Sequence, residues 1–134
     1  RIALFIFEMS VKYFTIEEAN TLLPALKPLM GEILERRAKC ARQGRLVADL
    51  LRLPHVDIGG PILSELSAEF VVIERLLHKI KETGCIVKSL EGGMVDFLAK
   101  IDGRDVYLCW RYGEESITHY HELHTGFRGR QPLF

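Results

Sequence analysis

The sequence predicts an α+β fold, in which a long antiparallel helical hairpin with a short preceding helix packs on a small C-terminal antiparallel β-meander. Three observations support this prediction. Apolar residues recur at helical spacing as far as about residue 83, they alternate with a period of two after Gly84, and Asp102-Gly103 marks a hairpin turn. Spacings of three and four indicate amphipathic helices, whereas a period of two indicates half-buried strands.

The chain is expected to form a single domain with one core. Its 134 residues are 48% hydrophobic and 27% charged, the balance of an ordinary globular protein. We divide the chain into residues 1–11 as an extension or extra strand, 12–84 as the helical part, 85–127 as the β part and 128–134 as a C-terminal segment.

The first helix is predicted from its cap. Thr15-Ile16-Glu17-Glu18 has the pattern of a capping box, in which the first and fourth residues exchange hydrogen bonds, so a helix should begin at Ile16. Pro24 and Pro28 lack an amide proton and restrict the residues before them. We therefore expect a short helix as far as about Leu23, followed by a kink or a restart.

Two long helices should follow. The first continues to about Arg52, a loop rich in glycine and proline covers residues 53–61, and the second runs from Ile62 to about Thr83. Apolar residues of the second helix predict the seam of an antiparallel pair: Leu63, Leu66, Phe70, Ile73, Leu77 and Ile80. Off that seam lie Val71, Val72 and Leu76. This spare apolar flank must be covered either by the sheet or by another subunit, and we predict a homodimer that covers it.

The β part contains runs rich in β-branched and aromatic residues, bounded by glycines. The four expected strands are Cys85 to Ser89, Met94 to Ala99, Asp105 to Arg111 and Ile117 to His121. Asp102-Gly103 is the clearest turn, because both residue types tolerate positive φ. The terminal run Arg128 to Pro132 is polar and is expected to be neither strand nor helix.

Charge and cysteine content exclude several classes of protein. Basic and acidic residues number 18 each, so no overall positive field favours nucleic acid. The apolar run Ile2 to Phe7 is too short to span a membrane. Cys40, Cys85 and Cys109 are an odd number at wide spacings, typical of neither a disulfide framework nor a zinc cluster. We expect reduced cysteines and a cytoplasmic location.

The first candidate site is a metal site on the predicted sheet. His119 and His121 would share one face of a strand, and Asp96 from a neighbouring strand could complete two nitrogens and one carboxylate for a divalent metal such as zinc. A His-x-His pair is a short motif, so exposed polar residues on a strand edge are the more frequent alternative. Without metal, His121 beside Glu122 could still act as an acid or base.

The second candidate is an anion site around Arg111. Its guanidinium, with Arg128 or Arg130 added from the terminal segment and Trp110 beside it, could bind a carboxylate or phosphate. The more frequent arrangement is a structural pair, here with Glu114 or Asp96. Catalytic candidates are therefore His121, Glu122, Arg111 and Glu114. Cys109 is expected to be a small core residue, unless a neighbouring histidine lowers its pKa.

Several motifs resemble one known family. The run Lys12 to Asn20 followed by Leu22-Leu23-Pro24, together with Leu108-Cys109-Trp110-Arg111 and Gly129-Arg130-Gln131-Pro132, is similar to the uncharacterised family named domain of unknown function 2203. The resemblance implies a fold and the location of a site, and no activity. The polar motif positions that match are Asp96, Arg111, Glu114, His121, Glu122 and Arg130. His124 could join His119 and His121 at a metal only if the strand ends or bulges there. Both His119 and His124 fall outside the motif, which weakens such a three-histidine metal site.

Two classes of function follow. The first is a non-catalytic oligomeric interaction or ligand-binding module, whose polar cluster ties the sheet to the C-terminal segment. The alternative is a metal-dependent or acid/base enzyme of the hydrolase type, with a His/Glu/Asp/Arg cluster on the C-terminal sheet. The sequence contains no recognised nucleophile motif or phosphate loop, which favours the first class. A deep pocket lined by His121 and Arg111 would favour the enzyme.

Overall fold

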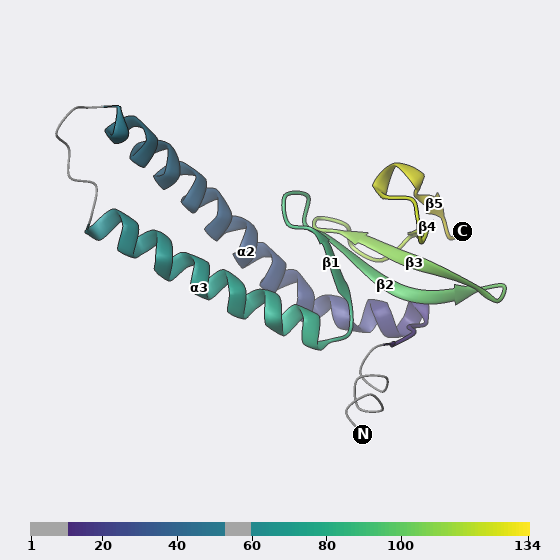
Figure 1. The fold of residues 1–134 in the computed structure, drawn as a ribbon. Helices are drawn as coiled ribbons and strands as arrows, with labels where there is room; N and C mark the ends of the chain where they lie inside the picture. The colour runs from purple at the N-terminus through teal and green to yellow at the C-terminus, as the bar shows by residue number, and fades with distance from the viewer. Residues whose placement is uncertain (1–10, 53–59) are drawn as a thin grey trace, which may run out of the picture.

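The computed structural model describes residues 11–52 and 60–134 (Figure 1). Two long helices, which form a hairpin, precede a five-stranded antiparallel sheet. This arrangement confirms the predicted α+β class and the order of its parts. The expectations for residues 1–10 and for most of the loop at 53–61 lie outside the described residues.

Helix α2 (Ile16–Leu51) begins at the predicted capping box, in which Glu18 N donates to Thr15 Oγ1 at 3.0 Å and Thr15 N donates to Glu18 Oε1 at 2.9 Å. The predicted short helix is wrong, because α2 continues through Pro24 and Pro28. Both prolines are exposed, so water can bond the carbonyls that they leave without a donor. The opposite face supplies the burial that keeps the helix continuous, with Leu23, Leu26, Met30 and Ile33 all in the core.

Helix α3 (Pro61–Glu82) returns beside α2. Its buried residues are Glu69, Ile73, Leu76 and Ile80. Part of the predicted seam is therefore wrong: Leu76 faces inward, and Phe70 is 57% exposed. The spacing of apolar residues in the sequence had placed Phe70 on the buried side of the helix and Leu76 off it, and the structure shows the reverse. A charged residue, Glu69, occupies the inward position, where Arg36 Nη1 donates to its carboxylate at 2.9 Å.

The sheet is a meander with strand order β1-β2-β3-β4-β5. Its strands are β1 (Ile86–Ser89), β2 (Met94–Ile101), β3 (Arg104–Arg111), β4 (His119–Glu122) and β5 (Gln131–Pro132). The turn between β2 and β3 is the predicted one, with φ of 52° at Asp102 and 78° at Gly103. The C-terminal segment differs from prediction, because it contains β5 and the 3₁₀ turn η1 (Phe127–Gly129).

The core lies between the first half of α2, the second half of α3 and one face of the sheet. Alternate residues of β2 and β3 supply the sheet side: Val95, Phe97 and Ala99, with Val106, Leu108 and Trp110. The start of α2 is fixed to the sheet, because Phe14 N donates to Leu98 O of β2 at 2.7 Å. The helices therefore cover the face of the sheet that carries these residues, and the opposite face does not pack on them.

The far end of the hairpin extends beyond the sheet (Figure 1). No side chain of α2 is buried between residues 34 and 50, and none of α3 is buried between residues 61 and 68. We call residues 34–51 and 61–72 the distal arm. Neither helix, over the residues described, has a segment long and apolar enough to cross a bilayer.

Candidate functional site

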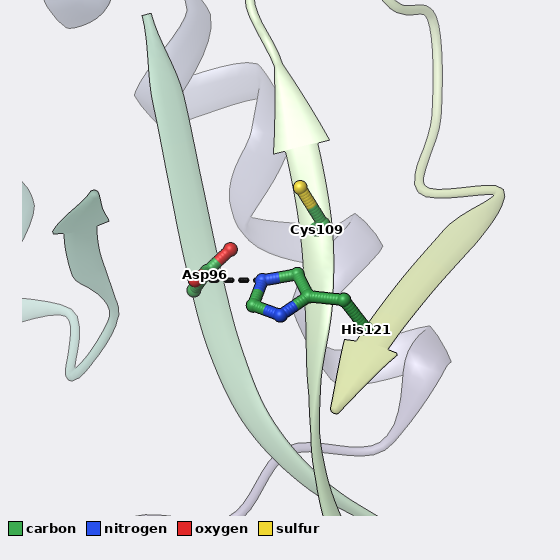
Figure 2. A group of neighbouring side chains, drawn as sticks. All are labelled: Asp96, Cys109 and His121. Atoms are coloured by element: carbon green, nitrogen blue, oxygen red, sulfur yellow. Dashed lines mark hydrogen bonds and ion pairs between the residues drawn. The ribbon is translucent and has the colours of Figure 1, made fainter. Parts of the chain in front are cut away.

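Three strands bring Asp96, Cys109 and His121 together (Figure 2). Asp96 of β2 lies directly opposite Cys109 of β3 in the antiparallel register. His121 of β4 is opposite Tyr107 and therefore diagonal to Cys109. One imidazole nitrogen, the thiol sulfur and one carboxylate oxygen all lie within 4.8 Å of one another. We call these three residues the polar triad.

The polar triad lies on the face of the sheet opposite the helices. Phe97, Leu108 and Trp110 point into the core, so the alternation of side chains sends Asp96 and Cys109 the other way. Figure 2 shows the triad side chains in front of the strands, with a helix passing behind them. All three residues are nevertheless 0% exposed. The site is closed to solvent.

The hydrogen bonds of His121 determine which ring nitrogen carries the proton. Nδ1 lies 2.8 Å from the backbone carbonyl oxygen of Glu122, which can only accept, so Nδ1 donates. Nε2 lies 3.0 Å from Asp96 Oδ2. In the neutral imidazole Nε2 therefore carries the lone pair and is directed at the carboxyl group. The pair shares one proton at this contact, either on Nε2 or on Asp96.

Burial disfavours the charged forms of both acidic members of the triad. Desolvation raises the pKa of Asp96, and the neighbouring His121 opposes that rise. For Cys109, burial and the Asp96 carboxylate together raise the pKa to about 12. Without a compensating cation, Cys109 is therefore a protonated thiol at neutral pH. This is the opposite of an activated nucleophile.

A second polar contact holds the C-terminal segment against the sheet. Glu114 accepts from Arg130 Nη2 at 2.9 and 2.8 Å, and from the backbone N of Arg111 at 2.7 Å. Its carbonyl oxygen accepts from Trp110 Nε1 at 2.9 Å. The Arg130 Nη2 also donates to the carbonyl oxygen of Cys109 at 3.3 Å. These bonds tie residue 130 to the strand that carries the thiol.

Other predicted site residues have separate roles. His119 Nδ1 lies 2.8 Å from Thr118 Oγ1, which is outside the triad. Glu122 accepts from Arg104 Nη1 at 2.8 Å. The exposed Arg111 guanidinium is 5.4 Å from the centre of the Phe127 ring. Trp110 is fully buried in the core, and His124 is exposed. The structure thus joins Asp96 with His121 and, at a separate contact, Glu114 with Arg130, while the other candidates lie outside both contacts.

Cys109 is the member of the triad that was expected to be a small core residue unless a neighbouring histidine lowered its pKa. The position of Cys109 opposite Asp96 could have been predicted from the hairpin turn between β2 and β3. A two-residue turn at Asp102-Gly103 pairs Ile101 with Arg104, and counting outward from that pair sets Asp96 opposite Cys109. His121 could not be placed by the same counting, because a longer irregular connection joins β3 to β4.

Comparison with known proteins gives one family match. A family model described as an uncharacterised conserved protein, DUF2203, matches residues 12–133. No curated protein and no solved structure matches the chain. The match covers helices α2 and α3, strands β1 to β5 and every residue of the polar triad. This chain belongs to the DUF2203 family of uncharacterised conserved proteins.

Proposed function

We propose that this protein is a non-catalytic interaction module that forms a homodimer through its distal arm. The observation that carries the proposal is the exposure of large apolar side chains on two helices over which residues 11–52 and 60–134 place no second layer. Phe70 is 57% exposed, which is unusual for a phenylalanine in the middle of a helix. Further exposed apolar side chains on the arm are Leu46, Leu63 and Val71.

Charge favours a second copy of the chain as the occupant. The arm segment of α2 carries five basic side chains and two acidic ones between residues 34 and 51, whereas the arm segment of α3 carries two acidic and no basic ones between residues 61 and 72. Within one chain, Arg36 and Lys39 already pair with Glu69. In a dimer, α2 of each copy can lie beside α3 of the other with the same complementarity.

The surface near Phe70 has room for an apolar side chain. Arg37, Cys40, Ala41, Phe70, Ile73 and Leu90 line a hollow of about 380 Å³ between the hairpin and the sheet. Apolar area removed from water contributes about 1.5 to 3 kcal/mol for a fully buried phenylalanine. Two such contacts, related by two-fold symmetry, would support a four-helix arrangement.

The alternative function, an acid/base or metal-dependent hydrolase, has the Asp96–His121 pair in its favour. Its difficulty is access, because both side chains have no exposed surface through which a substrate could be reached. Arg111 is more accessible to a small anionic ligand than Asp96 and His121 are, because its guanidinium is exposed. We also propose a cytoplasmic location, since Cys40, Cys85 and Cys109 are all free thiols.

Light scattering after size exclusion tests the dimer. The wild-type chain is expected at the mass of two 15.3 kDa chains at micromolar concentration. Phe70→Glu should elute as a monomer with unchanged helical circular dichroism, because a charge in the centre of an apolar contact is desolvated without a partner. Phe70→Ala should weaken the dimer by roughly tenfold or more, from the lost apolar area.

The matched control is Leu123→Glu, which changes an apolar residue of 45% exposure that lies outside the arm. This variant should remain a dimer. A monomeric wild-type chain at micromolar concentration would overturn the proposal. So would a dimer that Leu123→Glu dissociates while Phe70→Glu leaves it intact.

A further inference from the structure

We infer that Asp96, Cys109 and His121 bind one divalent transition metal ion, for which zinc is the best match. This site is on the sheet and is independent of the proposed dimer on the arm. Its first feature is the orientation of the imidazole. Because Nδ1 of His121 donates to the carbonyl oxygen of Glu122, Nε2 is the ring nitrogen left to bind a metal, and it faces Asp96. A backbone carbonyl on one ring nitrogen is the usual support for a histidine that binds metal through the other.

The carboxyl group of Asp96 has unused bonding capacity. Asp96 is fully buried, and its Oδ1 has no hydrogen-bond partner among the described residues. A buried carboxylate oxygen without a donor costs on the order of 1 to 3 kcal/mol. Oδ2 and Nε2 are 3.0 Å apart, so a cation placed between the carboxyl group and the ring would be bound by both. A cation bound through Oδ1 would give that oxygen the positively charged partner that it lacks.

The third donor and the net charge point to a soft divalent ion. Cys109 supplies sulfur, His121 nitrogen and Asp96 oxygen, which is a donor set that zinc accepts and that magnesium and calcium do not favour. Two anionic ligands and one neutral imidazole would neutralise a divalent ion. A neutral group suits a site with no exposed surface better than separate charges do.

The distances suit one ion after a small rotation of the side chains. Zinc bonds of about 2.0 to 2.3 Å in a tetrahedron place donor atoms roughly 3.3 to 3.8 Å apart. The three donor atoms lie within 4.8 Å of one another, and two of them come from residues directly opposed on neighbouring strands. The sheet therefore fixes their separation before any ion arrives. Three protein donors leave one tetrahedral position for water or another small ligand.

The test begins with the wild-type chain purified without chelator and subjected to elemental analysis. We expect one zinc ion per chain. After removal of zinc with a chelator, titration with Co²⁺ should produce the intense thiolate-to-cobalt charge-transfer absorption that only a sulfur ligand gives. Co²⁺ or Zn²⁺ should also raise the melting temperature of the chelator-treated protein, because binding to the folded state alone stabilises it.

Variants identify the ligands. Cys109→Ser should abolish the charge-transfer absorption, and Asp96→Asn and His121→Ala should weaken Co²⁺ binding by more than about tenfold. The matched controls are Cys85→Ser, a buried thiol outside the triad, and His119→Ala, a histidine on the same strand; both should bind as the wild type does. If Cys109→Ser fails to fold, the wild-type spectrum decides alone. A wild type that contains no zinc and gives no thiolate absorption overturns the inference, as does absorption that survives Cys109→Ser.

Discussion

Arg130 Nη2 lies 2.9 and 2.8 Å from the two carboxylate oxygens of Glu114, which joins the C-terminal segment to the connection that follows β3. The Arg130 side chain is 11% exposed and that of Glu114 is 27% exposed, so the pair is largely protected from water. Arg130 also donates to the carbonyl oxygen of Cys109. The contact therefore connects the C-terminal segment, the connection after β3 and the strand that carries Cys109.

Replacement of Glu114 by alanine should destabilise the protein by about 2 kcal/mol. The variant leaves the Arg130 guanidinium without its carboxylate, and removal of one partner from a buried pair costs about 3 to 5 kcal/mol, less here because Glu114 is partly exposed. Urea denaturation measures the effect. Glu115→Ala, at an exposed neighbouring position, is the control and should change stability by no more than about 0.5 kcal/mol. Equal effects of the two variants would show that the pair contributes little.

The β2–β3 hairpin and the start of α2 could be predicted because their signals are local. The Asp102-Gly103 turn fixes the register of β2 and β3 over eight residue pairs, and Thr15 with Glu18 fixes the start of α2. In each case the residues that determine the structure are within a few positions of it. The fold class followed from these local signals together with the change of hydrophobic period.

The wrong predictions have their origin in tertiary packing. Pro24 and Pro28 disfavour a helix locally, yet burial of Leu26 and Met30 on the other face outweighs that cost. The seam of α3 was predicted partly wrongly because Glu69 is buried. A prediction from the spacing of apolar residues places a charged residue on the exposed side. Its partner, Arg36, lies on the other helix, and no local pattern connects the two.

The ion pair between Arg36 and Glu69 makes the hairpin sensitive to acid. The hydrogen bond from Arg36 holds the pKa of Glu69 below its ordinary value of 4.5. A carboxylate with a lowered pKa contributes stability that is fully present above pH 4.5 and is lost as the pH falls through the lowered pKa. The free energy of unfolding should therefore decrease below pH 4.5, and it should decrease less in Glu69→Gln.

Urea denaturation at a series of pH values between neutrality and the acid range measures this difference. Glu74→Gln, which changes an exposed carboxylate on the same helix, is the matched control and should follow the wild-type curve. Parallel curves for the wild type and Glu69→Gln would mean that the pair does not contribute to acid sensitivity.

Two glycine-to-alanine variants should have opposite effects on stability. Gly93, in the turn before β2, has φ of +66°, and a Cβ there would lie 2.8 Å from the Cβ of Tyr112. The conformation alone costs an alanine about 1 to 2 kcal/mol, and the steric contact with Tyr112 adds to it. Gly93→Ala should therefore destabilise the protein by at least about 2 kcal/mol. Gly44 is inside α2, and a methyl group added there would have no neighbouring atom within 4 Å among the described residues.

Gly44→Ala should stabilise the protein by about 0.5 to 1 kcal/mol, because alanine loses less backbone entropy than glycine when a helix forms. Chemical denaturation of both variants beside the wild type measures the two shifts. Because Gly44 lies on the distal arm, the same variant also reports on the surface that we propose as the dimer contact. A stabilised monomer with weakened association would place the added methyl group at the contact between copies, whereas unchanged association would place Gly44 on the outer side of the arm.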